Sequence, residues 1–264
     1  RGMFFEDLPQ GIGQVHRVKN IHKQDRMSMQ WALLSSGPSG YTGGPMNIER
    51  MKTLIAHLAS SPGRIIAADE YRESSVVVPL IAPREADAGM DDWRILYEKR
   101  AAHIPQGGES CFPGGRIDPG ESHHQAAFRE LEEETGISPG QAVHTAFYGS
   151  LVNPGGRLVH VWIALLPKMP STRPNEEVEK LFTCSLGQLR QAPQSVYRIS
   201  TEFGRTSEAI PFERYGLGEP YARRWRGADL QVLFYEDLPE LIWGMTAKIS
   251  RELVDQLYAA ETLT

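Results

Sequence analysis

The stretch GRIDPGESHHQAAFRELEEETGI, which spans Gly115–Ile137, decides the fold class of this chain. Residues 121–135 contain neither proline nor glycine and consist mostly of good helix formers, so they predict a helix. Glu121 lies near the predicted start, where the helix dipole favours a carboxylate, and Gly136 supplies the left-handed residue at which a helix ends. A glycine turn followed by a helix is therefore expected.

Three glutamates share one face of this predicted helix. Glu130, Glu133 and Glu134 are spaced i, i+3 and i+4, which places their Cβ atoms about 5–6 Å apart. Carboxylates this close repel one another, and a bound Mg²⁺ or Mn²⁺ would reverse that cost because these ions prefer oxygen ligands. Arg129 precedes Glu133 by four residues and can hold that carboxylate in place. Taken alone, the same residues would also suit a solvated acidic helix face.

The flanking residues match a known motif at every defined position. These positions are Gly115, Glu121, Arg129, Glu130, Leu131, Glu133, Glu134, Gly136 and Ile137. On this match the chain resembles the Nudix hydrolases. The resemblance implies an α/β/α sandwich with a mixed central sheet, and attack of water on a phosphorus of a diphosphate bridge. It also implies that Glu130, Glu133 and Glu134 bind Mg²⁺ or Mn²⁺ while Arg129 and Glu121 orient them. The motif leaves open which glutamate acts as a base.

A second segment narrows the resemblance to the coenzyme A diphosphatase branch. Ile95–Ala101, a predicted strand that ends in an arginine and a small residue, leads to Gly108–Gly115, which ends in FPGG. The resemblance covers roughly residues 45–258 and implies coenzyme A or its thioesters as substrates. An arginine that the branch has between Arg100 and Gly108 is missing, which would weaken selectivity for the 3′-phosphate of coenzyme A.

Further residues are predicted to serve the substrate. Arg100 is expected to contact phosphate, although it could be a surface charge. Gly114 and Gly115 are expected to shape a turn that lets the backbone approach the phosphates. Glu177, in a loop after the catalytic strands, is a candidate base or an ordinary loop carboxylate.

The rest of the chain divides into an N-terminal extension, residues 1–45, and a hydrolase domain, residues 46–264. Apolar spacing predicts a helix from Ile48 and another over Trp243–Tyr258. Residues 192–227 are expected to form a long irregular insertion before the last strand. The predicted strands are Ser75–Ile81, Arg94–Arg100, His144–Val152, Arg157–Leu166, Val178–Cys184 and Leu230–Tyr235.

The insertion is rich in arginine and aromatic residues, so it predicts an alternative function. Arg223 and Arg224 could bind RNA phosphates while neighbouring aromatic side chains stack on bases, which would suit hydrolysis of RNA 5′ ends. The competing interpretation packs the aromatic side chains under the loop and leaves the arginines in solvent. A third hypothesis makes the fold a binding module in a larger complex, with residues 1–45 docking to a protein partner.

Composition excludes few functions. A formal net charge of -5 argues against bulk electrostatic binding to nucleic acid, and 41% hydrophobic residues suit a globular domain. No apolar run is long enough for a bilayer, and no signal peptide is apparent. Cys111 and Cys184 form no disulfide framework, so a soluble intracellular protein in a reducing compartment is expected. The cytosol, the mitochondrion and the peroxisome remain open.

Overall fold

The structure is a computed structural model of the chain. It describes residues 65, 67–85, 88–153, 155–203, 212–216 and 225–261. All of these residues belong to one compact unit, Ile65–Thr264. The predicted extension 1–45, the predicted helix from Ile48, and both Arg223 and Arg224 lie outside the described residues. Among the described residues, no helix is long and apolar enough to cross a membrane.

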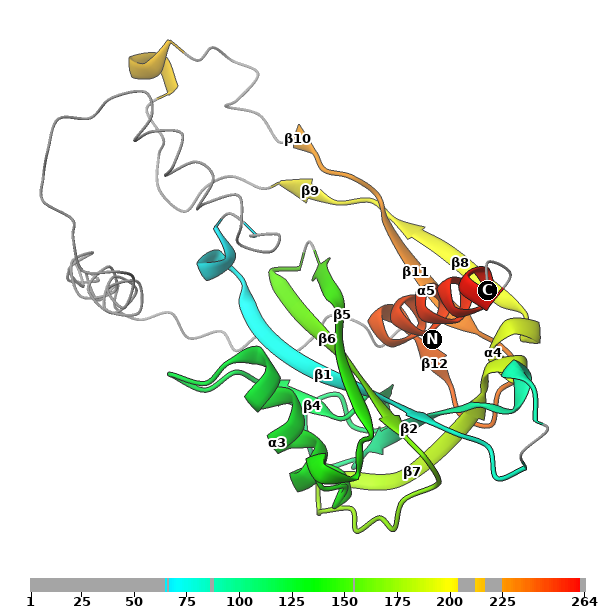
Figure 1. Cartoon of the computed structure of the whole chain (residues 1–264). Helices are drawn as coiled ribbons and strands as arrows, with labels where there is room; N and C mark the ends of the chain where they lie inside the picture. Colours follow the sequence, from blue (N-terminus) through cyan, green and yellow to red (C-terminus); the bar gives the residue numbers. More distant parts are fainter. Residues whose placement is uncertain are drawn as a thin grey trace, which may run out of the picture. The chain divides into compact units, whose positions relative to one another are not determined.

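A mixed sheet organises this unit (Figure 1). Its strand order is β3-β2-β1-β6-β5, with β4 added to β1 and β7 added to β2. Strands β1 and β6 run parallel, and the other pairs are antiparallel. The strands are β1 Arg72–Ile81, β2 Arg94–Arg100, β3 Ser110–Cys111, β4 Gly114–Arg116, β5 His144–Asn153, β6 Arg157–Leu166 and β7 Val178–Ser185. The strands predicted for this part of the chain are therefore present.

Helices cover both faces of the sheet because its central strands are apolar on both sides. Along β1, Val77 and Ile81 point into one core while Val78 and Leu80 point into the other. The first core includes the apolar side of helix α3, His123–Thr135, and the second includes residues of α4, Leu186–Gln191, and α5, Gly244–Glu261 (Figure 1). The predicted α/β/α sandwich with a mixed central sheet is confirmed.

A second sheet corrects the prediction for residues 192–227. Strand β8, Gln194–Ile199, pairs antiparallel with β11, Leu230–Tyr235, so the start of this segment is not irregular. The strand escaped prediction because most of its side chains are exposed, and no alternation of buried and solvated positions marks it. The predicted last strand is β11, but β12, Ile242–Trp243, follows it and pairs with it.

Short elements complete the described part of the chain. Strand β9, Glu202–Phe203, pairs with β10, Trp225–Arg226. The 3₁₀ helices are η1 Ala68–Glu70, η2 Met90–Asp92, η3 Pro139–Gln141 and η4 Phe212–Tyr215.

Candidate active site

Helix α3 carries the acidic motif and begins two residues later than predicted. Ser122 is its N-cap: the Gln125 backbone N–H donates to Ser122 Oγ at 3.2 Å, and the Ser122 N–H donates to Gln125 Oε1 at 2.9 Å. Glu121 therefore lies before the helix and not in its first turn. Gly136 ends the helix as predicted, with φ 74° and its N–H donated to Glu132 O at 2.9 Å.

Glu121 forms a fixed anchor for Arg129. Its carboxylate accepts from Arg129 Nε at 3.0 Å and Nη2 at 3.1 Å, and from the Asp118 backbone N–H at 3.1 Å. The Arg129 guanidinium lowers the pKa of Glu121, and Glu121 raises the pKa of Arg129 in return. Both groups thus stay charged, and the guanidinium is held by two parallel hydrogen bonds.

The other edge of the same guanidinium reaches the motif glutamates. Arg129 Nη1 donates to Glu130 Oε1 at 2.8 Å and to Glu133 Oε2 at 3.1 Å. The contact with Glu133 is the one expected from the helical spacing, and the contact with Glu130 is additional. One arginine therefore links the loop before the helix to two carboxylates on its acidic face.

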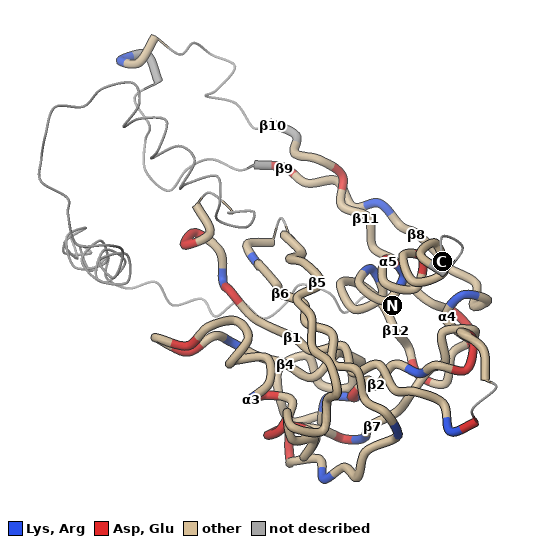
Figure 2. Tube along the Cα trace, in the orientation of Figure 1, with Lys and Arg blue, Asp and Glu red and all other residues tan. Residues whose placement is uncertain are grey.

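The three motif glutamates share a face of α3, a helix whose acidic positions are red in Figure 2, but their side chains are buried to different extents. The side chain of Glu133 is 55% exposed and that of Glu130 is 18% exposed, whereas Glu134 is only 3% exposed. Glu134 Oε2 accepts the backbone N–H of Gly114 at 2.8 Å. Burial raises the pKa of both Glu130 and Glu134. The acidic face thus runs from solvent down to the sheet.

Gly114 and Gly115 form strand β4 and are needed for close packing. A Cβ at Gly114 would lie 2.3 Å from Ser75 O on β1, and a Cβ at Gly115 would lie 2.3 Å from Glu130 Oε1. The predicted turn is therefore a short strand paired with β1, and its glycines let α3 and its carboxylates approach the sheet. An approach of this backbone to phosphates stays a prediction.

Glu98 on β2 was missed by the sequence reasoning. Side chains alternate along a strand, so Glu98 points to the same face as the buried Leu96, beneath α3. Its side chain is 1% exposed, and burial raises its pKa. An acidic residue at an inward position of a strand predicted as buried was the signal that could have identified it.

Arg100 and Glu177 lie beside this acidic region. Arg100 Nε donates to Pro105 O at 3.2 Å, and Arg100 Nη1 is 3.8 Å from Glu98 Oε1. Glu177 is exposed, its backbone O accepts the Ala101 N–H at 2.8 Å, and the charge of its carboxylate contributes to the raised pKa of Glu130. A phosphate contact for Arg100 and the role of a base for Glu177 stay predictions.

The carboxylate side chains gathered at this site are of the chemical type that binds a hard divalent cation. Glu98, Glu130, Glu133 and Glu134 supply carboxylate oxygens, and Glu98 Oε2 is buried with no hydrogen-bond partner in the part of the chain that the structure describes. Within that part, no three Asp, Glu, His or Cys side chains converge in a geometry that could hold an ion. Coordination would therefore require carboxylates to exchange their present hydrogen bonds for contacts with the cation.

Aromatic rings surround the start of α3. His123 stacks with His160 at 4.7 Å and lies 5.4 Å from Trp162 and 5.1 Å from Phe147, measured between ring centroids. Trp162 Nε1 donates to His123 Nδ1 at 3.0 Å. His123 is half-buried by these contacts.

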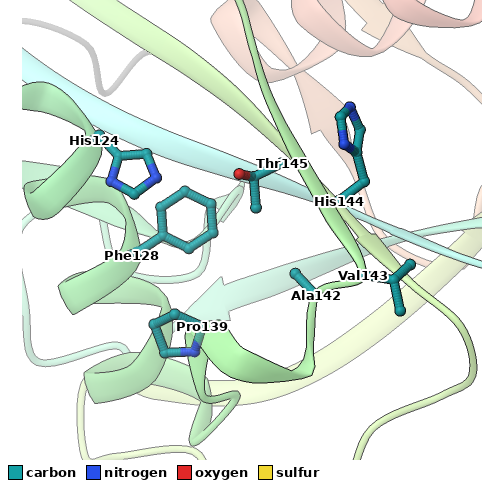
Figure 3. Close-up of a pocket in the computed structure, with 7 residues that line it drawn as sticks. All are labelled: His124, Phe128, Pro139, Ala142, Val143, His144 and Thr145. Carbon is teal, nitrogen blue, oxygen red and sulfur yellow. The ribbon is translucent and has the colours of Figure 1, made fainter.

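An open pocket of about 430 Å³ lies nearby, between α3 and the start of β5 (Figure 3). His124 and Phe128 face it from the helix, and Thr145 faces it from β5. None of its lining residues is a predicted metal ligand, so this pocket is separate from the carboxylates of the motif.

Comparison with known proteins agrees with the geometry. A family model described as the NUDIX domain matches residues 73–203. The CTP pyrophosphohydrolase of Escherichia coli is 34% identical over 39% of this chain and 74% of that protein. The uncharacterized Nudix hydrolase NudL of Photorhabdus laumondii is 29% identical over 72% of this chain and 87% of that protein. Nudix hydrolase 3 of Caenorhabditis elegans is 32% identical over 42% of this chain, which spans 45% of that protein.

The fold and the site define an α/β/α hydrolase domain whose acidic helix follows a glycine-containing strand. The chain belongs to the Nudix hydrolase family.

Proposed function

We propose that this protein uses Mg²⁺ or Mn²⁺ to hydrolyse the diphosphate bond of a nucleoside diphosphate derivative, with coenzyme A or its thioesters as the first candidate substrate. One observation carries the proposal. Glu130, Glu133 and Glu134 share one face of α3, and a single arginine, Arg129, holds two of them from one side.

The chain's own residues divide the work. Glu130, Glu133 and Glu134 would hold the cation, which supplies activation of water and neutralises charge that develops on the phosphoryl oxygens. Arg129 orients the carboxylates of Glu130 and Glu133, and Glu121 orients Arg129.

The base that accepts a proton from the attacking water must be accessible. Glu133 and Glu177 are the exposed carboxylates beside Glu130, so these two are the candidates. Water adds its oxygen to one phosphorus, and the bridging P–O bond breaks, so each product keeps one phosphate of the diphosphate. With coenzyme A, the products are 4′-phosphopantetheine and adenosine 3′,5′-bisphosphate.

The coenzyme A assignment rests on the segment that runs from Arg100 to Gly115. Arg100 ends β2 beside the acidic region, where its guanidinium could turn from Pro105 O to a substrate phosphate. No second arginine follows it before Gly108, so we expect weak discrimination for the 3′-phosphate. CTP is the alternative substrate to compare with coenzyme A, since the relative from Escherichia coli is named a CTP pyrophosphohydrolase.

RNA and protein partners remain separate proposals. Arg223 and Arg224 are the residues on which RNA binding would depend, and residues 1–45 are the segment proposed to dock to a protein.

The two cysteines bear on the cellular compartment. Cys111 and Cys184 are free thiols, which supports a reducing compartment inside the cell.

The experiment compares kcat/KM for coenzyme A, its dephosphorylated form, CTP and a short 5′-triphosphorylated RNA in the presence of Mg²⁺, with the products identified by mass. We expect the highest value for coenzyme A and a small penalty for its dephosphorylated form. A clear preference for CTP or RNA would overturn the coenzyme A assignment but not diphosphate hydrolysis. No turnover of any of the four substrates would overturn the proposed function.

Two variants of adjacent residues test the site. Glu133→Gln should abolish turnover while the protein remains folded, because it removes a cation ligand and a candidate base. Glu132→Gln is the matched control, since Glu132 is also exposed on α3 but lies outside the acidic motif face. Equal loss in both variants would contradict the assignment of the site to that face.

A further inference from the structure

The buried carboxylate of Glu98 has no structural explanation in its immediate surroundings. It lies on β2 opposite Cys111 of β3 on one side and Leu181 of β7 on the other. Carboxylates are rarely this deeply buried unless they are paired or bind a cation, because desolvation of the charge is costly. Each oxygen of Glu98 must therefore be accounted for.

The two oxygens of Glu98 are poorly compensated. Oε1 accepts from Cys111 Sγ at 3.1 Å and lies 3.8 Å from Arg100 Nη1. A thiol is a weak donor, and 3.8 Å exceeds a hydrogen bond. Oε2 is buried and receives no hydrogen bond in the described part of the chain. The carboxyl group of Glu134 lies within hydrogen-bond reach of the Glu98 carboxyl group, but the two can bond only if one of them is protonated. The available donors thus leave half of the carboxylate unsatisfied.

The neighbours on the α3 side add negative charge. The charges of Glu98 and Glu130 both contribute to the raised pKa of Glu134, and the charge of Glu130 contributes to that of Glu98. The Arg129 guanidinium pairs with Glu121, Glu130 and Glu133. The basic side chain within ion-pair distance of Glu98 is Arg100, whose Nη1 lies 3.8 Å from Glu98 Oε1. Glu98 on β2 and Glu134 on α3 are therefore two strongly buried carboxylates with too little positive charge nearby to balance them.

We propose that Glu98 is an additional carboxylate ligand for the divalent cation of this site, contributed by β2 from outside the acidic helix. The inference rests on the proposed function and extends its ligand set beyond the Nudix box. A hard cation bound between Glu98 and Glu134 would satisfy the unpartnered Oε2 and convert repulsion into attraction. The alternative is one proton shared by the two carboxyl groups, which would also satisfy Oε2 without any cation.

The test measures Mn²⁺ binding directly, from the paramagnetic resonance signal of free Mn²⁺ during titration of the full chain. Glu98→Gln should weaken the tightest site by about tenfold or more, the order found when groups that support a metal site are removed. Glu179→Gln is the matched control: it removes the same charge from the neighbouring strand β7, where Glu179 is exposed and contacts Lys99 at 3.2 Å. This control should bind Mn²⁺ like the parent.

Glu98→Asp guards against a failure to fold. It keeps the charge but shortens the side chain, so it should bind Mn²⁺ with intermediate affinity. Parental affinity in Glu98→Gln, or in Glu98→Asp if the first variant does not fold, would overturn the inference in favour of the shared proton. Turnover by the parent with that same result would leave the proposed function standing. A parent protein that neither binds Mn²⁺ nor hydrolyses any substrate would overturn both.

Discussion

The carboxylate of Glu130 rests against the Cα of Gly115, so closely that a β-carbon at position 115 would meet Glu130 Oε1 at 2.3 Å. Gly115→Ala should therefore displace the Glu130 side chain. We expect kcat to fall by about 100-fold, the order associated with a misplacement of about 1 Å in an active site. The loss of stability should be small by comparison, because the contacted atom is the far end of a side chain.

Steady-state kinetics and urea unfolding of the same preparation check this prediction. Gly140→Ala is the control, since a β-carbon at Gly140 meets no atom within 4 Å. Parental kcat in Gly115→Ala would show that the position of Glu130 does not depend on this glycine.

The glycine that ends α3 leads to a second prediction, which concerns the free energy of unfolding. Gly136 has φ +74°, and a β-carbon there would lie 2.9 Å from the Arg173 backbone N. Gly120 has φ +86° but open space around it. Both alanine variants should lose about 1–2 kcal/mol from the left-handed conformation. Gly136→Ala should lose more, because it also displaces the backbone packed against the helix end.

Urea titration of both variants gives the comparison directly. Equal losses would mean that the loop at Arg173 shifts without cost, and a greater loss in Gly120→Ala would contradict the packing argument.

The sequence predicted the parts of this fold that local chemistry determines. Gly136 ends α3 because only a residue tolerant of positive φ continues the chain there, and β1 and β6 form from long apolar runs. The predicted start of α3 is two residues too early, because the Ser122–Gln125 capping box sets His123 as the first helical residue. These features depend on neighbours a few residues apart.

The missed features depend on distant neighbours. The inward position of an acidic residue in the predicted strand marks Glu98 as unusual, but its place beside Glu134 is known only once the structure puts β2 under α3. His123 looks like a surface residue until β6 brings His160 and Trp162 against it. Strand β8 is stabilised by its pairing with β11, about thirty residues later in the chain, and no local pattern reports that pairing.

Arg129 provides a third prediction, because its guanidinium contacts Glu121, Glu130 and Glu133 at once. Lysine presents a single ammonium group and cannot bridge all three carboxylates. Arg129→Lys should therefore lower kcat by about 10–100-fold, with a smaller change in KM, as is typical when a group that orients ligands is lost. Arg157→Lys, at the exposed start of β6, is the matched control.

A double variant separates orientation from direct catalysis. If Glu121 acts through Arg129, adding Glu121→Gln to Arg129→Lys should cost little beyond the single variant. Fully additive losses would show that Glu121 acts by an independent route.

The ring stack at His123 makes the last prediction, which concerns pH. Burial lowers the pKa of His123 from 6.5, and the charges of His160 and His124 lower it further, while Glu73 opposes them. A histidine with a depressed pKa in the folded state contributes stability that is present above pH 6.5 and is lost as the pH falls through the folded value.

His123→Phe keeps a ring for stacking but removes this titration. The urea midpoint of the parent should therefore drop more between neutral and mildly acidic pH than that of His123→Phe. His103→Gln, a substitution of an exposed histidine, should follow the parent. Because the buried carboxylates change stability in the opposite direction over the same range, only the difference between variant and parent isolates His123. An identical pH response in His123→Phe and the parent would mean that this histidine is as easily protonated in the folded chain as in the unfolded one.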